Sequence, residues 1–559
     1  MKKEIPLEKS YGDDHVDDHV DKEIEDCFST KNPKCFFVFA GAGSGKTRSL
    51  INTLNFLDRE QGENLLMNGK QVAVITYTNA ACDEISRRLQ YKTIFSVSTI
   101  HSFLWDLIKY YQADIKSWLV ESVQKEIEEL QRKKTKKTGS KAGEKREEKI
   151  KKKMDRLAKI RTVQKFSYNP NGDNVGYDSL SHSEVIKMST EFIATEPTMQ
   201  DILTSKYPIL LIDESQDTKK ELIDALLIVC EKYSGKFIVG MFGDTMQKIY
   251  MDGKEDLAKC IPDNWIKPVK IMNHRSAKRI VTLANSIRST VDDKKQRARD
   301  DADEGIVRLF ITSESKDKEY IEKKVAEMMA QDTGDVGWND DDQYKSLILE
   351  HHMAASRFGF SELYMPLNDS KKFDTSLRDG SILELSILSK IVSPLVKAYK
   401  IGNDFEVAKI VRKNSPLLSK DAFVEEFKDQ TELLKNAEEA VETLMQLWND
   451  EKNLTCLEVL ESIQNTGLFD VGSRIDELLT EYSQDEDEKI TALRTALSVP
   501  FYEVERYALY VSDNTRFATH QGVKGLEFPR VMVILDDAQA KGFLFSYEKL
   551  FGVKAQSDT

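Results

Sequence analysis

The pattern of apolar and polar positions predicts strands buried on both faces, each linked to a polar turn or a helix. Four continuous apolar runs carry this pattern, over 35–40, 209–212, 237–242 and 531–535. Runs of this length are typical of strands in the interior of parallel sheets. The pattern therefore predicts the α/β fold class, with helices covering the sheets.

A charged segment in the first half of the chain has the apolar spacing of two helices. The first stripe consists of Val120, Val123, Ile127 and Leu130, and the second, after a turn-like "TGSKAG", of Ile150, Met154 and Leu157. Between 132 and 161, fifteen basic residues stand against four acidic ones, in a chain whose net charge is −13. We interpret this as a helical hairpin arm that contacts phosphates, for example through Lys133, Lys134, Lys136 and Lys137. A solvated surface arm or a flexible charge run is the alternative.

Length and composition indicate a cytoplasmic protein of several domains. The 559 residues exceed one ordinary core, and no apolar run is long enough to cross a membrane. The start of the chain does not have the pattern of a secretory signal. The six cysteines are scattered and lack zinc-site spacing, so we expect them to be reduced. His15 and His19 lie among aspartates, and we interpret that stretch as an acidic mobile tail rather than a metal site.

The segment after the first apolar run has the spacing of a P-loop. The predicted nucleotide-binding residues are Gly41, Ala42, Gly43, Ser44, Gly45, Lys46, Thr47 and Arg48. Glycines let backbone N–H groups turn toward phosphate oxygens, and the following helix N-terminus favours negative charge. Lys46 would reach the β- and γ-phosphates, and the Thr47 hydroxyl would ligate Mg²⁺.

Two carboxylates follow the second apolar run. Asp213 and Glu214 come directly after "ILLI". Asp213 would hold the Mg²⁺ shell, and Glu214 would orient and deprotonate the attacking water. Together with the P-loop, they predict ATP and Mg²⁺ as cofactors, with GTP left open by these two motifs alone.

The order of these and further segments resembles the superfamily 1 DNA helicases of the UvrD/PcrA/Rep type. The further segments are "TYTN" (76–79), "TIHSF" (99–103), "GDTMQ" (243–247), "NHRS" (273–276) and "KGLEF" (524–528). The resemblance covers most of the chain and implies two RecA-like P-loop parallel-sheet cores with helical insertions. It also implies movement along single-stranded DNA in the 3′ to 5′ direction.

The resemblance assigns roles to individual residues. Residues implied on the DNA track are Tyr77, Thr78, Asn79, His101, Ser102, His520 and Lys524, with Tyr77 stacking on a base. Residues implied around the nucleotide are Gln216, Gly525 and Glu527, with Gln247 sensing the γ-phosphate and Arg275 acting as an arginine finger from the second core. Glu214, Gln247 and Arg275 form the implied catalytic set.

Several features depart from the family's pattern. No glutamine motif precedes the P-loop, so the preference for ATP rests on the resemblance. His274 stands where the family has tyrosine, and the family's Gly-Trp pair is missing after Tyr250. The last motif, with a second finger arginine, is not recognisable, because 536–559 contain no arginine and we interpret "RYALYVSDNTRF" (506–517) as a strand entry. We therefore expect the isolated chain to bind Mg-ATP and single-stranded DNA but to hydrolyse ATP slowly and to unwind DNA poorly.

The organisation expected is a first core over 1–110 and 196–272, with the basic arm inserted at 111–195. A second core would take 273–375 and 506–559, including strands such as "GIVRLFIT" (305–312), with a helical insert at 376–505. His351 and His352 are interpreted as fold or track residues. The function indicated is an ATP-dependent DNA helicase or translocase acting on single-stranded or partly duplex DNA. The alternative is an ATP-gated DNA sensor that regulates a nuclease or ATPase partner, as helicase-like subunits of Gabija-type anti-phage systems exemplify; a P-loop ATPase unrelated to nucleic acid is the third possibility.

Overall fold

A computed structural model describes residues 16–29, 31–132, 141–170, 177–244, 257–289, 294–312, 317–370, 372–378, 380–419, 430–449, 453–472, 474–480, 487–512, 515–520, 522–539, 546–550 and 552. The chain forms two compact units, Met1–Leu309 and Phe310–Thr559. Each contains a parallel sheet and buried apolar residues. The predicted α/β fold class is confirmed.

The first unit is built on a six-stranded parallel sheet with the order β3-β2-β4-β5-β1-β6. Its strands are β1 (Phe36–Ala40), β2 (Val72–Thr76), β3 (Phe95–Thr99), β4 (Ile209–Ile212), β5 (Ile238–Gly243) and β6 (Val269–Lys270). The residues of β1, β2, β4 and β5 are buried throughout, as expected for strands covered on both faces.

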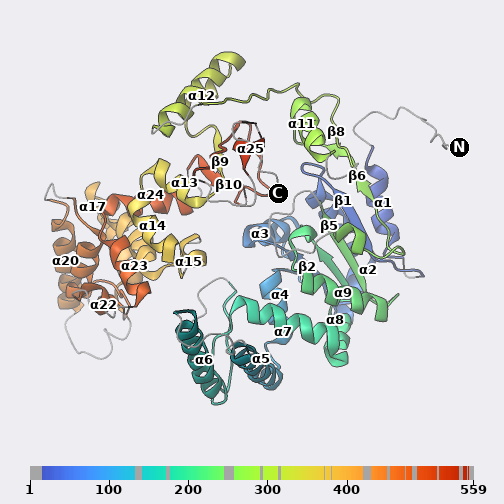
Figure 1. The fold of residues 1–559 in the computed structure, drawn as a ribbon, viewed down its shortest axis with the longest axis horizontal. Helices are drawn as coiled ribbons and strands as arrows, with labels where there is room; N and C mark the ends of the chain where they lie inside the picture. Colours follow the sequence, from blue (N-terminus) through green and yellow to red (C-terminus); the bar gives the residue numbers. More distant parts are fainter. Residues whose placement is uncertain are drawn as a thin grey trace. The chain divides into compact units, whose positions relative to one another are not determined.

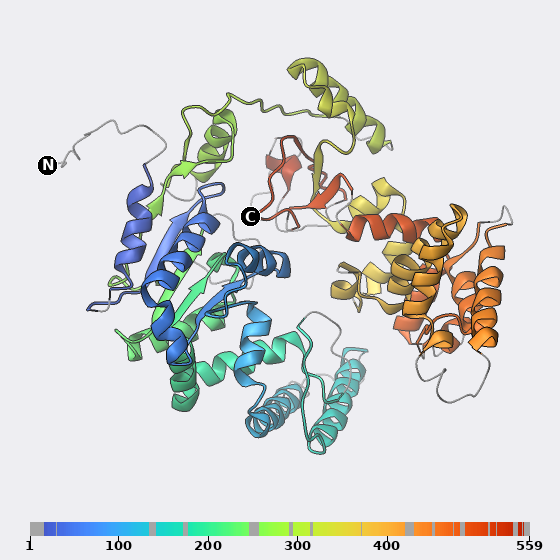
Figure 2. The same ribbon diagram turned by 180° about the vertical axis from the view of Figure 1, so that it is seen from behind.

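Helices cover both faces of this sheet (Figures 1 and 2). On one face lie α1 (Asp18–Asp26), α2 (Lys46–Met67) and α3 (Asn79–Arg88), and on the other α4 (Ile100–Ile108), α7 (His182–Thr195), α8 (Pro197–Lys206), α9 (Lys220–Lys232) and the short α10 (Leu257–Cys260). Side chains of β1 alternate between the two cores, with Phe36 and Val38 in one and Phe37 and Phe39 in the other. This alternation fixes which strand residues each helix layer buries.

The predicted arm is a pair of packed helices, α5 (Gln112–Arg132) and α6 (Lys141–Ile160). Ile127 and Ile150 are both buried in the same core cluster, and Lys153 forms an ion pair with Glu126 of α5. Met154 departs from the expected buried stripe, since 54% of its surface is exposed. The four tip lysines named above, at 133, 134, 136 and 137, lie outside the described residues.

The first unit continues past residue 272. From the sequence, the second core was expected to begin at residue 273. It includes β7 (Met272–Asn273), α11 (Lys278–Arg288) and β8 (Arg297–Ala298), and β7 pairs with β8 in parallel. The "NHRS" segment therefore lies in the same compact unit as the P-loop.

Residues 18–26 of the acidic start form helix α1, so the prediction of a mobile tail is wrong for them. Asp17 is only 6% exposed, and its two carboxylate oxygens accept the backbone N–H groups of Ile271 and Met272 at 3.1 and 3.0 Å. Asp21 of α1 accepts the Ser49 hydroxyl at 2.5 Å. These carboxylates bond to specific donors, which composition alone does not reveal. His15 lies outside the described residues.

The second unit has a three-stranded parallel sheet and a large helical body. The sheet has the order β10 (Phe517–Thr519), β9 (Lys345–Ile348), β11 (Val531–Val533). The helices are α12 (Lys318–Thr333), α13 (His351–Phe358), α14 (Ser361–Ser370), α15 (Asp374–Arg378), α16 (Leu383–Ile387), α17 (Ser393–Lys400), α18 (Asp404–Asn414), α20 (Gln430–Gln446), α21 (Cys456–Thr466), α22 (Ile475–Leu479), α23 (Glu488–Leu497), α24 (Phe501–Val511) and α25 (Tyr547–Leu550).

Two strand predictions are wrong. Residues 305–312 are neither strand nor helix, and Leu309 and Ile311 are 61% and 71% exposed, because no strand among the described residues pairs with the segment. Residues 506–511 belong to α24, in which Tyr507 and Tyr510 are buried at helical spacing. The strand β10 begins only at Phe517.

A buried ion pair joins β5 to α11 and gives a test of the fold of the first unit. Asp244, which follows β5, lies 3.1 Å from Arg288, and the two residues are only 3% and 9% exposed. Removing one partner leaves a buried charge, so Arg288→Ala should lower the free energy of unfolding by about 3–5 kcal/mol in urea titrations. The control Lys92→Ala breaks an exposed pair with Asp58 and should cost less than about 1 kcal/mol. Equal small losses in both variants would contradict this account of the pair.

Candidate functional site

The segment between β1 and α2 forms a loop shaped to cradle an anion. Gly43 and Gly45 have φ angles of 69° and 81°, which residues with a Cβ adopt only with strain. Ser44 is buried, and its hydroxyl donates to the Gly41 carbonyl at 2.8 Å. The loop leads directly into the N-terminus of α2, where backbone N–H groups and the helix dipole favour phosphate.

Lys46 and Glu214 form an ion pair between α2 and the turn after β4. Lys46 Nζ lies 3.6 Å from Glu214 Oε2 and donates to the Ala40 carbonyl at 3.3 Å. Gln216 Nε2 donates to the same Glu214 oxygen at 2.7 Å, and Gln216 Oε1 accepts the Asp244 N–H at 3.1 Å. A phosphate that enters the loop would compete with Glu214 for the Lys46 ammonium.

The residues after β1 and β4 fit a magnesium ion held chiefly by a nucleotide. Thr47 is half-buried at the start of α2, and Asp213 is 8% exposed, with Oδ1 accepting the Glu214 N–H at 3.0 Å. A hydroxyl and a carboxylate are oxygen ligands of the kind Mg²⁺ prefers. Within the described part of the chain, no cluster of three or more His, Cys, Asp or Glu side chains is placed to hold a metal. The Thr47 hydroxyl and the Asp213 carboxylate suit Mg²⁺, which keeps waters and phosphate oxygens as further ligands. Arg48 is exposed.

The predicted nucleotide and DNA-track residues described in the first unit follow the carboxyl ends of strands in the six-stranded sheet, except Arg275, which follows β7 of the two-stranded sheet. The pairing aligns Ile75 of β2 with Ile212 of β4, and Thr76 with Thr99 of β3. The turns that carry Tyr77, His101 and Glu214 therefore leave the sheet at the same edge. The Asp213 N–H donates to the Ile75 carbonyl at 2.8 Å, which joins the carboxylate turn directly to the strand before Tyr77.

The track segments after β2 and β3 both begin helices through threonine caps. Thr78 accepts the Ala81 N–H at 3.1 Å at the start of α3, and Tyr77 is 36% exposed. Asn79, the first residue of α3, is exposed, and Thr99 accepts the Ser102 N–H at the start of α4. Tyr77 stands directly before the first of these caps, where β2 ends.

His101 contacts the segment that follows the arm. Its ring lies 5.0 Å from that of His182, the first residue of α7, and the Tyr168 hydroxyl lies 2.5 Å from His182 Nδ1. Burial, followed by the charges of His182 and Lys219, lowers the pKa of His101 to about 4. The predicted track residue therefore packs, uncharged at neutral pH, between the core and the return from the arm.

The "NHRS" turn is bonded to the phosphate loop. The Asn273 side chain donates to the Ala42 carbonyl at 3.0 Å, and the His274 N–H donates to the Gly43 carbonyl at 2.8 Å. Asn273 Oδ1 accepts the N–H groups of Arg275 and Ser276 at 3.0 and 2.8 Å. The Arg275 backbone is thus fixed beside the P-loop, and its side chain is exposed.

The remaining predicted site residues lie in the second unit or outside the described residues. His520 follows β10, and Lys524, Gly525 and Glu527 lie in the loop before β11, where Gly525 has a φ of 81°. Gln247 lies outside the described residues. The histidines after β9 bond to their surroundings, His351 to the Tyr510 hydroxyl at 2.7 Å and His352 to the Gln539 carbonyl at 2.6 Å. Hydrogen bonds of this kind are typical of residues that stabilise the fold.

Sequence reasoning missed several residues that shape the P-loop surroundings. They are Asp17, Asp244, Asn273 and Gln296. Asp244 had a usable signal, because it is a polar residue directly after a buried strand. Asn273 lies within a quoted motif, but its bond to Ala42 depends on a contact between residues far apart in sequence. Asp17 and Gln296 have no local signal.

The chain is similar to known proteins in two comparisons. Residues 24–252 match the family described as "AAA domain". The chain is 24% identical over 611 aligned positions to "Gabija protein GajB" of Bacillus cereus (strain HuB5-5), covering 92% of this chain and 87% of the relative. These likenesses support a nucleotide-binding domain of the ATPase and helicase type. In the described part of the chain, no helix has the length and apolar character needed to span a membrane.

The position of His101 predicts an acid-sensitive stability. Its pKa in the fold, about 4, is below the ordinary 6.5, so the unfolded chain binds a proton first as the pH falls. Stability from this residue is complete above pH 6.5 and is lost as the pH falls toward 4, by up to about 3 kcal/mol. Urea unfolding at pH 7 and pH 5 should show a smaller loss in His101→Asn than in wild type. The control His19→Asn alters an exposed side chain and should keep the wild-type loss; an identical loss in all three proteins would contradict the assignment.

Proposed function

We propose that this protein is an ATP-dependent DNA helicase or translocase that couples ATP hydrolysis to movement along single-stranded DNA. The observation that carries the proposal is the shared sheet edge. Glu214, which is ion-paired with Lys46, and the turn that holds Tyr77 follow the adjacent parallel strands β4 and β2, joined by the Asp213-to-Ile75 hydrogen bond. Movement 3′ to 5′ is part of the proposal through the resemblance to UvrD-type helicases.

The proposed chemistry assigns a separate task to each residue of the loop and the carboxylate turn. Backbone N–H groups of the glycine loop bind the phosphates, and Lys46 neutralises charge on them. Thr47 and Asp213 would hold Mg²⁺, which when bound neutralises charge on the phosphates. Glu214, released from Lys46 as phosphate enters, is then placed to accept a proton from the attacking water. Arg275 is proposed as the arginine that approaches the phosphates.

The proposed track uses the turn after β2 and the first turn of α4. Tyr77 is exposed enough to stack on a base, a contact that tolerates any sequence. Thr78 and Asn79 follow it, while His101 and Ser102 start α4 at the same sheet edge. Because Asp213 bonds to Ile75, a displacement of the carboxylate turn on phosphate binding would reach the Tyr77 turn through one strand.

A second candidate function is favoured by one observation, the likeness to a Gabija protein over most of both chains. In that case the chain would be an ATP-gated DNA sensor that regulates a partner nuclease, with little unwinding of its own. A strand-displacement assay run beside a DNA-stimulated ATPase assay separates the two. ATP turnover with strand displacement supports the helicase or translocase. ATP turnover or DNA binding without strand displacement supports the sensor. The absence of any effect of DNA contradicts both.

Substitutions in the Lys46–Glu214 pair test the proposed chemistry. Lys46→Ala should abolish turnover by removing the phosphate-binding charge. Glu214→Gln should retain ATP binding and lower turnover by about 10² to 10⁴, because the general base is lost. Measurements are steady-state phosphate release and binding of a fluorescent ATP analogue. Asp58→Asn, on the surface of α2, serves as the control, and near-wild-type turnover in both site variants would refute the assignment.

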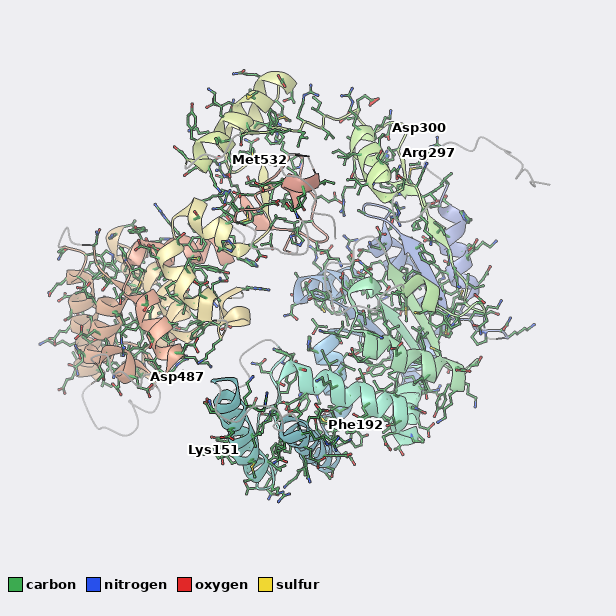
Figure 3. The ribbon with its side chains drawn as sticks, viewed as in Figure 1. Lys151, Phe192, Arg297, Asp300, Asp487 and Met532 are labelled. Atoms are coloured by element: carbon green, nitrogen blue, oxygen red, sulfur yellow. The ribbon has the colours of Figure 1, made fainter. Side chains whose placement is uncertain are left out.

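Substitutions on α6 test the arm as a phosphate-contacting surface. Lys149 and Lys151 are exposed on α6, and Lys151 is labelled in Figure 3. Changing both to alanine should weaken DNA binding for all sequences and flatten the slope of log affinity against log salt by roughly 0.7 to 0.9 for each phosphate that is no longer neutralised. A control pair, Lys409→Ala with Lys435→Ala, removes two exposed lysines of the second unit. If the slope of the α6 variant equals that of the control, the arm is only a solvated surface.

A further inference from the structure

A glutamine from a distant part of the first unit is bonded to the phosphate loop. Gln296 Nε2 donates to the Ala42 carbonyl at 3.0 Å, across 254 positions of sequence. Asn273 Nδ2 donates to the same carbonyl at 3.0 Å and also lies 3.4 Å from Gln296 Oε1. Two side-chain amides therefore meet at one carbonyl of the loop that binds phosphate.

The backbone of Gln296 is held firmly. Asn285 of α11 accepts its N–H at 2.8 Å and donates to its carbonyl at 2.7 Å. The next residue, Arg297 (labelled in Figure 3), pairs with Met272 in the β7–β8 ladder. Lys294, two residues earlier, lies over the ring of Phe39 at the end of β1. A side chain on such a support keeps a fixed position without any bound ligand.

The amide of Gln296 occupies the space beside the first glycine of the loop. A Cβ on Gly41 would lie 2.6 Å from both Gln296 Cδ and Nε2, so the contact requires a residue without a side chain. Lys46 Nζ donates to the carbonyl of Ala40, the residue before Gly41. The P-loop lysine reaches the β- and γ-phosphates, so its ammonium marks the terminal-phosphate end of the site. Gln296 contacts Gly41 and Ala42, the two residues that follow the carbonyl bonded by this ammonium.

The hydrogen-bonding capacity of Gln296 leaves a donor for a ligand. The amide nitrogen carries two hydrogens, and one is directed at the Ala42 carbonyl. Within the described part of the chain, the amide nitrogen bonds to no other acceptor, so its second hydrogen remains for a ligand. A neutral donor fixed beside a phosphate oxygen gains more than one that must be ordered on binding, because its orientation is already set.

We propose that Gln296 is a further substrate-contacting residue, whose amide donates to the terminal phosphate of ATP. The inference rests on the proposed nucleotide site and deepens it. It distinguishes the triphosphate from the diphosphate, because ADP lacks the group that Gln296 reaches. Asn273 is the positioning partner that holds the amide on Ala42.

The test compares the affinity of the full chain for ADP and for a non-hydrolysable ATP analogue, both with Mg²⁺, by isothermal titration. In Gln296→Ala, the analogue should bind roughly ten- to a hundredfold more weakly, the range of a hydrogen bond to a charged group, while ADP affinity stays within about twofold. The matched control is Gln61→Ala. Gln61 lies on α2, and its side-chain amide donates to the Phe28 carbonyl at 3.2 Å. It should leave both affinities at the wild-type values.

Retained ADP binding shows that Gln296→Ala is folded. If that variant binds no ADP, Gln296→Glu keeps the size of the side chain and places a carboxylate at the same point. This charge should repel the analogue more strongly than ADP. Unchanged affinities, or equal losses for the two nucleotides, in the variant that binds ADP would overturn the inference. Failure of the wild-type chain to bind either nucleotide would instead refute the proposed nucleotide site.

Discussion

The parallel register of β2 and β4 is the constraint on which the candidate site depends. It places the end of one strand, before Tyr77, beside the end of the other, before Asp213, and the Asp213-to-Ile75 hydrogen bond extends the pairing past β4. Carboxyl ends of parallel strands share one edge, where open α/β sheets bind ligands. A shift of this register by one residue would turn the apolar side chains of β4 to the opposite face and move the carboxylate turn away from Lys46.

The residue with the proposed chemical role has a strained backbone. Glu214 has a φ of 51°, a left-handed conformation that costs a residue other than glycine about 1 kcal/mol or more. Its surroundings over-determine that conformation: Asp213 accepts its N–H, Gln216 donates to its carboxylate, and Lys46 neutralises it. Gln216 also accepts the Asp244 N–H, so the turn after β4 is tied to the end of β5. Binding of phosphate by Lys46 would remove one of these supports, which gives the turn a reason to respond to the nucleotide.

The sequence was sufficient for the elements whose signals are local. Buried strands are visible as apolar runs, the glycine loop has a fixed spacing, and the arm shows two helical stripes, so β1, β4 and the α5–α6 pair were predictable. The predictions were wrong or incomplete where contacts between residues far apart in sequence determine the structure. The acidic start is ordered because Asp17 finds two backbone N–H groups near residue 271, and Gln296 reaches Ala42 from a segment with no motif. The apolar residues 305–312 resemble a strand but have no strand partner in the described part of the chain. Tyr507 and Tyr510 are buried by helical packing that a short window cannot reveal.

The central claim is that the phosphate loop and the Tyr77 turn are energetically coupled within the first unit. The direct measurement is the affinity of the full chain for a single-stranded oligonucleotide, at one salt concentration, with and without a saturating non-hydrolysable ATP analogue. Coupling predicts a change of at least about fivefold, and an equal factor in the affinity for the analogue when the oligonucleotide is present. Identical affinities in both directions would show that the two sites act independently and would contradict the account.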